Sequence, residues 1–231
     1  MAAKPTRDRI VEAAAALLAE GGRDAVSTRA VCSAAGVQAP AIYRLFGDMN
    51  GLLEAAGSLG LAAYLAEKTA LKDSDDPVED LRAGWDLHVG FGLAQPAFYT
   101  LIFGAARPGH EPAAARQAAE ILRHGVRRIA QAGRLRVSEE RAAQLIHSTG
   151  KGVTLTLIAT PPDDRDLDLS VAARESVLAA VTVGAGAVPG TGAGDLRGAA
   201  VTLHARLEEA TVLTFAERVL LDEWLRRISH S

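Results

Sequence analysis

Residues able to bind metals or to act in catalysis are few and scattered in this chain. His204 and Glu208 lie four residues apart, which would place two metal ligands on one face of a helix. The segment DDRDLD, residues 163–168, is rich in carboxylates. Neither has a third ligand at a usable spacing or the glycine of a calcium loop, so we interpret both as solvated surface. Since nucleophile-elbow, phosphate-loop and zinc-protease motifs are absent too, we predict no catalytic site, no metal and no cofactor.

One short segment near the N-terminus has the spacing of a different chemistry. In VSTRAVCSAAGVQAPAIYRLFGD, residues 26–48, Gly36 separates two short helical patterns. Two such helices joined by a short turn are a helix-turn-helix, whose second helix can enter the major groove of DNA. Ile42 and Phe46 lie one turn apart and are expected to pack inward. The outer face then carries Ala39, Pro40, Tyr43 and Arg44. The small residues Ala39 and Pro40 can contact thymine methyl groups, and Tyr43 and Arg44 can donate hydrogen bonds to phosphates or bases.

The flanking patterns predict the helices that hold this segment. Apolar residues recur at helical spacing over residues 10–18, and Gly21-Gly22 ends that pattern. Ser27 is suited to cap a second helix that begins near Thr28. Gly36 suits the left-handed residue that ends it, and a third helix is expected over residues 39–45. Asp48 can cap a long fourth helix.

The remainder of the chain is predicted to be helical as well. A capping box, Thr214 with Glu217, marks the start of the last helix. We place the domain boundary at the beginning of the fourth helix, giving a helix-turn-helix domain over residues 1–50 and a larger domain over 51–231. The sequence therefore predicts an all-α fold, with further helices at about residues 77–94, 96–104, 111–132, 138–159, 169–184, 196–210 and 215–229.

Composition limits the classes of protein and of partner. The chain has 231 residues, a net charge of -3 and 4% aromatic residues. Contact with nucleic acid must therefore come from a local patch, and the first 50 residues carry one more basic than acidic side chain. The only cysteine, Cys32, cannot form an internal disulfide, which is typical of the cytoplasm. Because no apolar run is long enough for a membrane span, we expect a soluble, cytoplasmic protein without a membrane partner.

These motifs resemble a known family. The first helix, STRAVCSAAGVQAPAIYRLFGD and LLEAA together look like the DNA-binding domain of TetR-family transcriptional regulators, over about the first 55 residues. The resemblance implies a homodimer whose larger domain binds a small molecule and thereby controls binding to a double-stranded DNA operator. Where many members carry a lysine at the start of helix four, this chain has Met49, so a phosphate anchor is missing. By position, the residues that match the family's DNA contacts are Thr28, Arg29, Gln38, Ala39, Pro40 and Tyr43.

The segment FGLAQPAFYTLIFG more loosely resembles a stretch that lines the ligand cavity in one TetR-family subgroup. Aromatic residues crowd around its proline break, and such a cluster is either a pocket lining or plain core. We take it as a candidate site for a largely apolar effector. The candidate ligand-binding residues are Trp85, His88, Phe91, Phe98, Tyr99, Phe103 and His147.

The sequence thus favours a ligand-responsive DNA-binding regulator, most simply a repressor released from a palindromic operator. We expect the dimer interface on helices 138–159 and 169–184. One alternative is an activator or an effector-independent regulator with the same DNA-binding domain. Another is an all-helical enzyme or carrier that uses the C-terminal cavity, against which stands the missing catalytic constellation.

Overall fold

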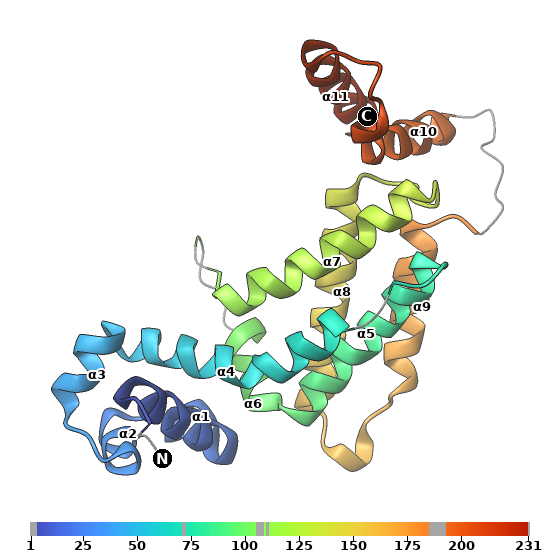
Figure 1. Cartoon of the computed structure of the whole chain (residues 1–231). Helices are drawn as coiled ribbons and strands as arrows, with labels where there is room; N and C mark the ends of the chain where they lie inside the picture. Colours follow the sequence, from blue (N-terminus) through green and yellow to red (C-terminus); the bar gives the residue numbers. More distant parts are fainter. Residues whose placement is uncertain (1–3, 71–72, 105–108, 110, 185–192, 231) are drawn as a thin grey trace. The chain divides into compact units, whose positions relative to one another are not determined.

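The computed structural model describes residues 4–70, 73–104, 109, 111–184 and 193–230 and is shown in Figure 1. Across these residues the chain forms α-helices joined by turns, with no strand beyond one isolated β-bridge. The all-α prediction is therefore confirmed. The chain divides into two compact units, and helices α5, α7 and α8 contribute residues to both. The first unit comprises Met1–Ala70, Leu87–Ala118 and Thr154–Pro162, and the second comprises Leu71–Asp86, Ala119–Val153 and Asp163–Ser231.

The helix-turn-helix lies in the first unit. It consists of α2 (Thr28–Ala35) and α3 (Ala39–Phe46), preceded by α1 (Thr6–Ala25) and followed by the long α4 (Met49–Ala70). Helix α1 packs against α2 and α4, and α3 packs against α4, around a core that includes Ile10, Leu18, Val31, Ile42 and Leu52. The helix is interrupted at the predicted Gly21-Gly22 pair, because Gly22 adopts the non-helical φ 67°, ψ -166°, and one further short turn reaches Ala25. Helix α1 is therefore kinked rather than ended there.

The first unit also contains the aromatic segment. Helix α5 (Pro77–Ala94) has the bounds expected from the sequence. After Gln95 the chain forms α6 (Pro96–Tyr99) and then a single π-helical turn, η1 (Thr100–Gly104). Helix α6 contacts both α1 and α4. The predicted helix at residues 96–104 is thus confirmed as helical but changes its hydrogen-bond pattern halfway.

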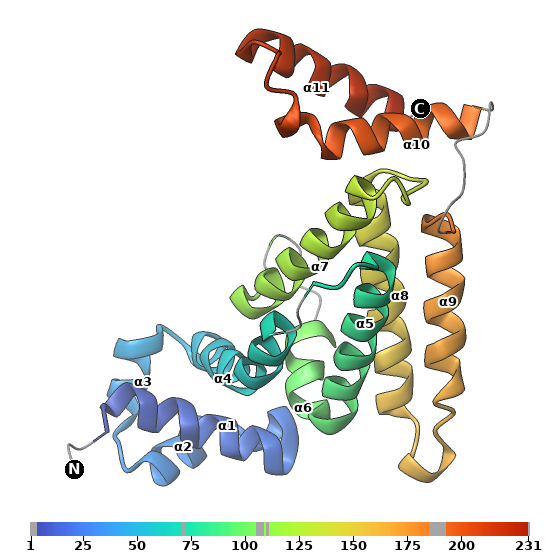
Figure 2. The same cartoon turned by 45° about the vertical axis from the view of Figure 1, so that its right-hand side comes forward.

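The second unit is built from the first part of α5 and the helices that follow α6. These are α7 (Ala113–Gln131), α8 (Glu139–Ala159), α9 (Asp168–Val181), α10 (Ala193–Ala205) and α11 (Phe215–His230), with short 3₁₀ turns at Pro162–Asp164 and Leu207–Glu209. Helix α9 runs alongside α8 in both views (Figure 2). A single antiparallel bridge, Leu135 with Thr182, joins the turn after α7 to the end of α9.

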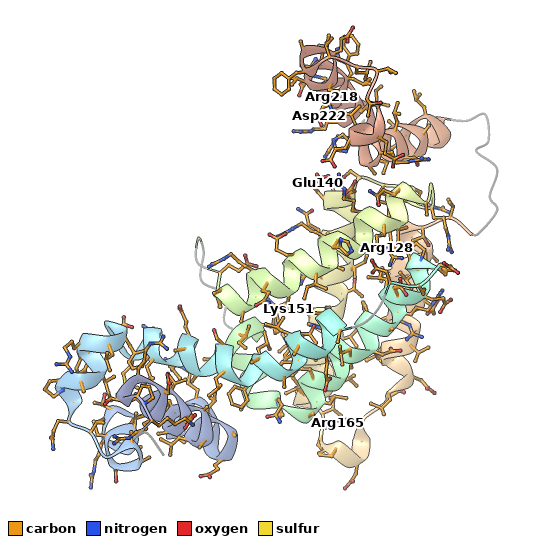
Figure 3. All side chains as sticks on the ribbon, viewed as in Figure 1. Arg128, Glu140, Lys151, Arg165, Arg218 and Asp222 are labelled. Atoms are coloured by element: carbon orange, nitrogen blue, oxygen red, sulfur yellow. The ribbon has the colours of Figure 1, made fainter. Side chains whose placement is uncertain are left out.

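Helices α10 and α11 pack together as a hairpin at the C-terminal end of the second unit. The predicted capping box begins α11: the Thr214 hydroxyl donates to Glu217 Oε2 at 2.7 Å, and the Glu217 amide donates back to Thr214 Oγ1 at 3.4 Å. His204 Nε2 and Asp222 Oδ1, 2.9 Å apart, join the two helices, and Asp222 is labelled in Figure 3. His204 therefore has a hydrogen-bonding partner on α11.

No helix in the described ranges is both long and apolar enough to cross a membrane. Among the same residues, no group of three or more histidine, cysteine or carboxylate side chains could hold a metal ion.

An arginine-carboxylate cluster joins α5 to α9 within the second unit. Arg82 donates to Glu175 through Nε (3.0 Å to Oε1) and Nη2 (2.8 Å to Oε2), and Arg174 also donates to Glu175 (2.9 Å). The two guanidinium groups lower the pKa of the Glu175 carboxyl to about 2. Because the folded-state pKa lies below the ordinary value, this carboxylate stabilises the fold above about pH 4.5 and loses that contribution as pH falls toward 2.

We expect Glu175→Gln to lower the free energy of unfolding by about 1 kcal/mol at pH 7, since the carboxylate is partly exposed and screened. The difference from the parent protein should shrink as pH falls from 4.5 toward 2. Urea unfolding at pH 7, 4 and 2.5 measures it. Glu223→Gln, which breaks an exposed pair within α11, is the control and should change stability by only a few tenths of a kcal/mol. A Glu175→Gln difference that stays constant with pH would contradict this account.

Candidate nucleic-acid interface

The turn between α2 and α3 is fixed by local hydrogen bonds. Ser27 Oγ accepts the Ala30 amide at 3.2 Å, so the predicted cap of α2 is confirmed. Gly36 ends α2 in the left-handed conformation, φ 62° and ψ 47°, as its position predicted. Arg9 of α1 donates to the carbonyl oxygens of Ala35 and Gly36, which satisfies acceptors that the end of α2 leaves open. Helix α1 therefore holds the turn directly.

The outer surface of α2 and α3 carries the residues expected to contact DNA. Ile42 is fully buried, and the opposite side of α3 faces solvent, with Tyr43 49% exposed. Tyr43 Oη lies 3.5 Å from Thr28 Oγ1, so the two helices bring these polar groups together. Gln38 precedes α3 without capping it. Side chains of Arg29, Gln38, Pro40, Tyr43 and Arg44 are exposed, while Thr28 and Ala39 are half-buried.

The end of α3 is held from both sides. Phe46 is only half-buried, and the Arg7 guanidinium lies 5.4 Å from its ring centroid. Gly47 closes α3, and Asp48 Oδ1 accepts the Gly51 amide at 2.8 Å, which confirms Asp48 as the start of α4. The arrangement gives a short, solvent-facing helix with small residues in its first turn, which can approach base edges closely.

Residues 10–56 match the model of the family described as bacterial regulatory proteins, tetR family. The N-terminal domain is therefore similar to the DNA-binding domain of this family. The match spans the kinked α1, both helices of the helix-turn-helix and the first part of α4, whose geometry is described above. No curated protein shows significant similarity to the chain at the level of sequence.

Solved structures of TetR-family proteins share the fold over most of the chain. SmeT, the repressor of the Stenotrophomonas maltophilia multidrug efflux pump SmeDEF, is 25% identical with a TM-score of 0.60, covering 81% of this chain and 96% of its own. A TetR variant from Acinetobacter baumannii AYE, in complex with minocycline, is 21% identical with a TM-score of 0.58, covering 77% and 96%. A TetR-family protein from Shewanella sp. PV-4 is 20% identical with a TM-score of 0.60, covering 78% and 100%. The chain thus has the fold of a TetR-family transcription regulator.

Five of the seven candidate ligand-binding residues lie in the first unit. Rings of His88, Phe91, Tyr99 and Phe103 contact one another, and Phe98 packs against Gly60 of α4. Phe91, Phe98, Tyr99 and Phe103 are each at most 8% exposed. Ring centroids of Tyr99 and Phe103 lie 4.8 Å apart, and those of His88 and Phe103 lie 5.4 Å apart. As they stand, these rings form a buried cluster that stabilises the unit.

A chain of polar groups runs through this aromatic cluster. Lys68 Nζ donates to Tyr64 Oη at 2.9 Å, Tyr64 Oη lies 3.2 Å from His88 Nδ1, and His88 Nε2 lies 2.8 Å from Tyr99 Oη. Thr154 is hydrogen-bonded with Tyr99 at the far end. Burial raises the pKa of Tyr64, and it raises the pKa of Tyr99 to about 12, so both phenols stay protonated. The cluster therefore combines an apolar surround with a continuous set of hydrogen-bonding groups.

The other two candidates belong to the second unit. Trp85 is buried, and its indole Nε1 donates to Ser170 Oγ at 3.0 Å. Gly150 of α8 lies against the same ring, because an added Cβ there would be 3.3 Å from Trp85 Cζ3. His147 is exposed on α8. These two residues are thus not part of the packed cluster in the first unit.

Sequence reasoning missed Arg9, Tyr64 and Lys68. Arg9 sits in the first turns of α1 with no local signal of its role, because the carbonyls that it caps lie 26 and 27 residues away. Tyr64 and Lys68 are one turn apart on α4, a spacing that could have indicated a shared face. Their link to His88 depends on how α4 and α5 pack.

Burial without a carboxylate partner lowers the pKa of Lys68 to about 8. Below pH 8 the Lys68 side chain is charged in both the folded and the unfolded protein, and burial of this charge lowers the free energy of unfolding. This destabilisation disappears as pH rises toward the ordinary pKa of 10.5. We expect Lys68→Met to raise the free energy of unfolding by about 1–2 kcal/mol at pH 7. This increase in the free energy of unfolding should be smaller at pH 10.

Chemical unfolding of both proteins at pH 7, 8.5 and 10 measures this effect. Lys151→Met on α8 (labelled in Figure 3) is the matched control, because Lys151 is also a half-buried lysine, and it should stay within about 0.5 kcal/mol of the parent at each pH. A Lys68→Met effect that is destabilising, or equal at pH 7 and 10, would show that the ammonium is not penalised by burial.

Proposed function

We propose that the protein is a dimeric, ligand-responsive transcription regulator that binds a palindromic operator through α2 and α3. The observation that carries the proposal is the exposed outer face of α3, where Pro40, Tyr43 and Arg44 flank a closely approachable first turn. Thr28 and Arg29, at the start of α2, lie where phosphate contacts position such a helix in the groove. Gln38 and Ala39 complete the proposed DNA-contacting set.

We further propose that it is a repressor whose operator affinity falls when a largely apolar small molecule binds. SmeT, which shares the fold, is a repressor, and the Acinetobacter protein binds minocycline. Weakening operator affinity a hundredfold needs about 2.7 kcal/mol of coupling, which a few buried contacts can supply. The buried cluster of His88, Phe91, Phe98, Tyr99 and Phe103 remains one candidate for the responsive region, and Trp85 and His147 remain candidates in the second unit. An activator would use the same DNA interface and differ only in where its operator lies.

Tyr43→Ala and Arg29→Ala are each expected to weaken binding to the specific operator by about 1–3 kcal/mol, because each removes a base or phosphate contact. Anisotropy titrations with labelled operator, over a range of salt concentrations, measure the loss. Arg29→Ala should also reduce the salt dependence, since one phosphate contact is lost.

Two controls accompany these variants. Arg218→Ala on α11 (Arg218 is labelled in Figure 3) removes an arginine outside the interface and should leave operator affinity unchanged. Met49→Lys adds a cation beside the helix-turn-helix and should strengthen binding to all DNA sequences. Operator binding that survives both Tyr43→Ala and Arg29→Ala would mean that α3 is not the reading helix.

We propose that the dimer forms through α8 and α9, as the sequence predicted. Exposed residues of α9 recur along one face and are mostly small: Leu169, Ala172, Ser176 and Ala179. Small side chains let two helices approach closely, and homodimer interfaces are more apolar than the remaining surface. A dimer also doubles the groove surface that a single helix-turn-helix can contact.

Ala179→Arg is expected to shift the protein from dimer to monomer, because it brings a like charge from each protomer into the proposed interface. Sedimentation velocity at micromolar concentration measures the change. Ala63→Arg, an equivalent substitution on the exposed side of α4, should leave the dimer intact. A parent protein that sediments only as a monomer would remove the dimer from the proposal.

A further inference from the structure

A cavity of about 520 Å³ lies in the first unit, between the end of α1, the first half of α4 and the α6–η1 segment. Its volume falls within the range of small-molecule sites. The wall is mostly apolar, and polar side chains stand around it. Residues that line it include Arg23, Glu54, Ser58, Ala97, Thr100 and Leu101. The aromatic rings of the buried cluster are not among its lining residues.

Two irregularities of the backbone occur at this cavity. The kink at Gly22 redirects the last turn of α1, and both Gly22 and Arg23 line the cavity. The π-helical turn η1 supplies Thr100, Leu101 and other lining atoms. Single π-helical turns cost regular hydrogen bonding and occur frequently at functional sites. Two of the segments that line the cavity therefore depart from regular α-helix.

The charges at the cavity indicate the kind of ligand. Arg23 is exposed, and within the described residues its side chain has no hydrogen-bond or ion-pair partner. Glu54 already takes part in another interaction. A guanidinium offers several donors in a fixed fork and pairs well with carboxylate or sulfonate groups. Among the described residues, a mostly apolar wall with the exposed Arg23 guanidinium at its edge fits an organic anion with an apolar body.

We propose that this cavity is a binding site for a small organic anion, with the apolar body against α4 and α6–η1 and the acidic group beside Arg23. The occupant would touch α1 and α4, the two helices against which α2 and α3 pack. Binding there acts directly on the elements that hold the DNA-reading helix. Binding of the anion does not depend on the proposed function. Only the claim that the anion changes DNA binding rests on the proposed function.

The test uses two fluorescent probes that differ by one acidic group. The first is 8-anilinonaphthalene-1-sulfonate, and the second is N-phenyl-1-naphthylamine, which has the same rings and no sulfonate. Titration of the full-length protein should give saturable binding of both. Ser58→Phe, which fills the cavity from α4, should weaken both probes about tenfold. Ala62→Phe, one turn along α4 and outside this cavity, should change neither.

Arg23→Gln separates the two probes. It should weaken the sulfonate probe about three- to fivefold, the size expected of an exposed ion pair, and leave the neutral probe unchanged. Ala97→Phe fills the cavity from α6 and serves as a second blocking variant, with circular dichroism checking that each variant is folded.

The proposal is overturned if folded Ser58→Phe or Ala97→Phe binds both probes like the parent. That result is expected if the probes instead bind the exposed apolar side chains of α11, which include Phe215, Val219 and Trp224. It is also overturned if Arg23→Gln weakens both probes equally. Operator binding, measured without probe, tests the proposed function separately, so either claim can fail while the other stands.

Discussion

The angle between the two helices proposed to read DNA depends on one backbone conformation, the left-handed residue at Gly36. A residue with a Cβ would be strained at φ 62°, by about 1–2 kcal/mol. Its side chain would also start 3.4 Å from Arg9 Nη2, the group that caps the end of α2. Gly36 and Arg9 together fix where α3 begins, and the positions of Gln38 and Tyr43 follow from that.

The same helices that support this turn also contact the aromatic segment. Helix α4 passes so close to α6 that a Cβ at Gly60 would lie 2.2 Å from Phe98 Cδ1. A displacement of α6 toward α4 would therefore press the Phe98 ring against the backbone at Gly60. On the proposed account, this close packing couples a bound small molecule to α3. The coupling needs no contact between ligand and DNA.

Local signals allowed much of the fold to be predicted. The caps at Ser27 and Thr214, and both ends of α5, depend on residues a few positions apart. The interruption of α1 at Gly22 was indicated by the glycine pair, whereas nothing in the local sequence indicated the π-helical turn. Similarly, the spacing of the aromatic residues indicated a cluster but could not distinguish rings that line a cavity from rings that stack on one another. The partner of Trp85, Ser170, lies 85 residues away. The exposed side of α3 could be predicted, since Ile42 marks its inward face.

The central claim is that a dimer of this chain reads a specific DNA sequence through α3. Selection of bound fragments from the genomic DNA of the source organism tests it most directly. The account predicts that the enriched fragments share an inverted repeat, and that a protein carrying Tyr43→Ala fails to enrich it. Enrichment of no common sequence, or equal enrichment by the Tyr43→Ala protein, would contradict the claim.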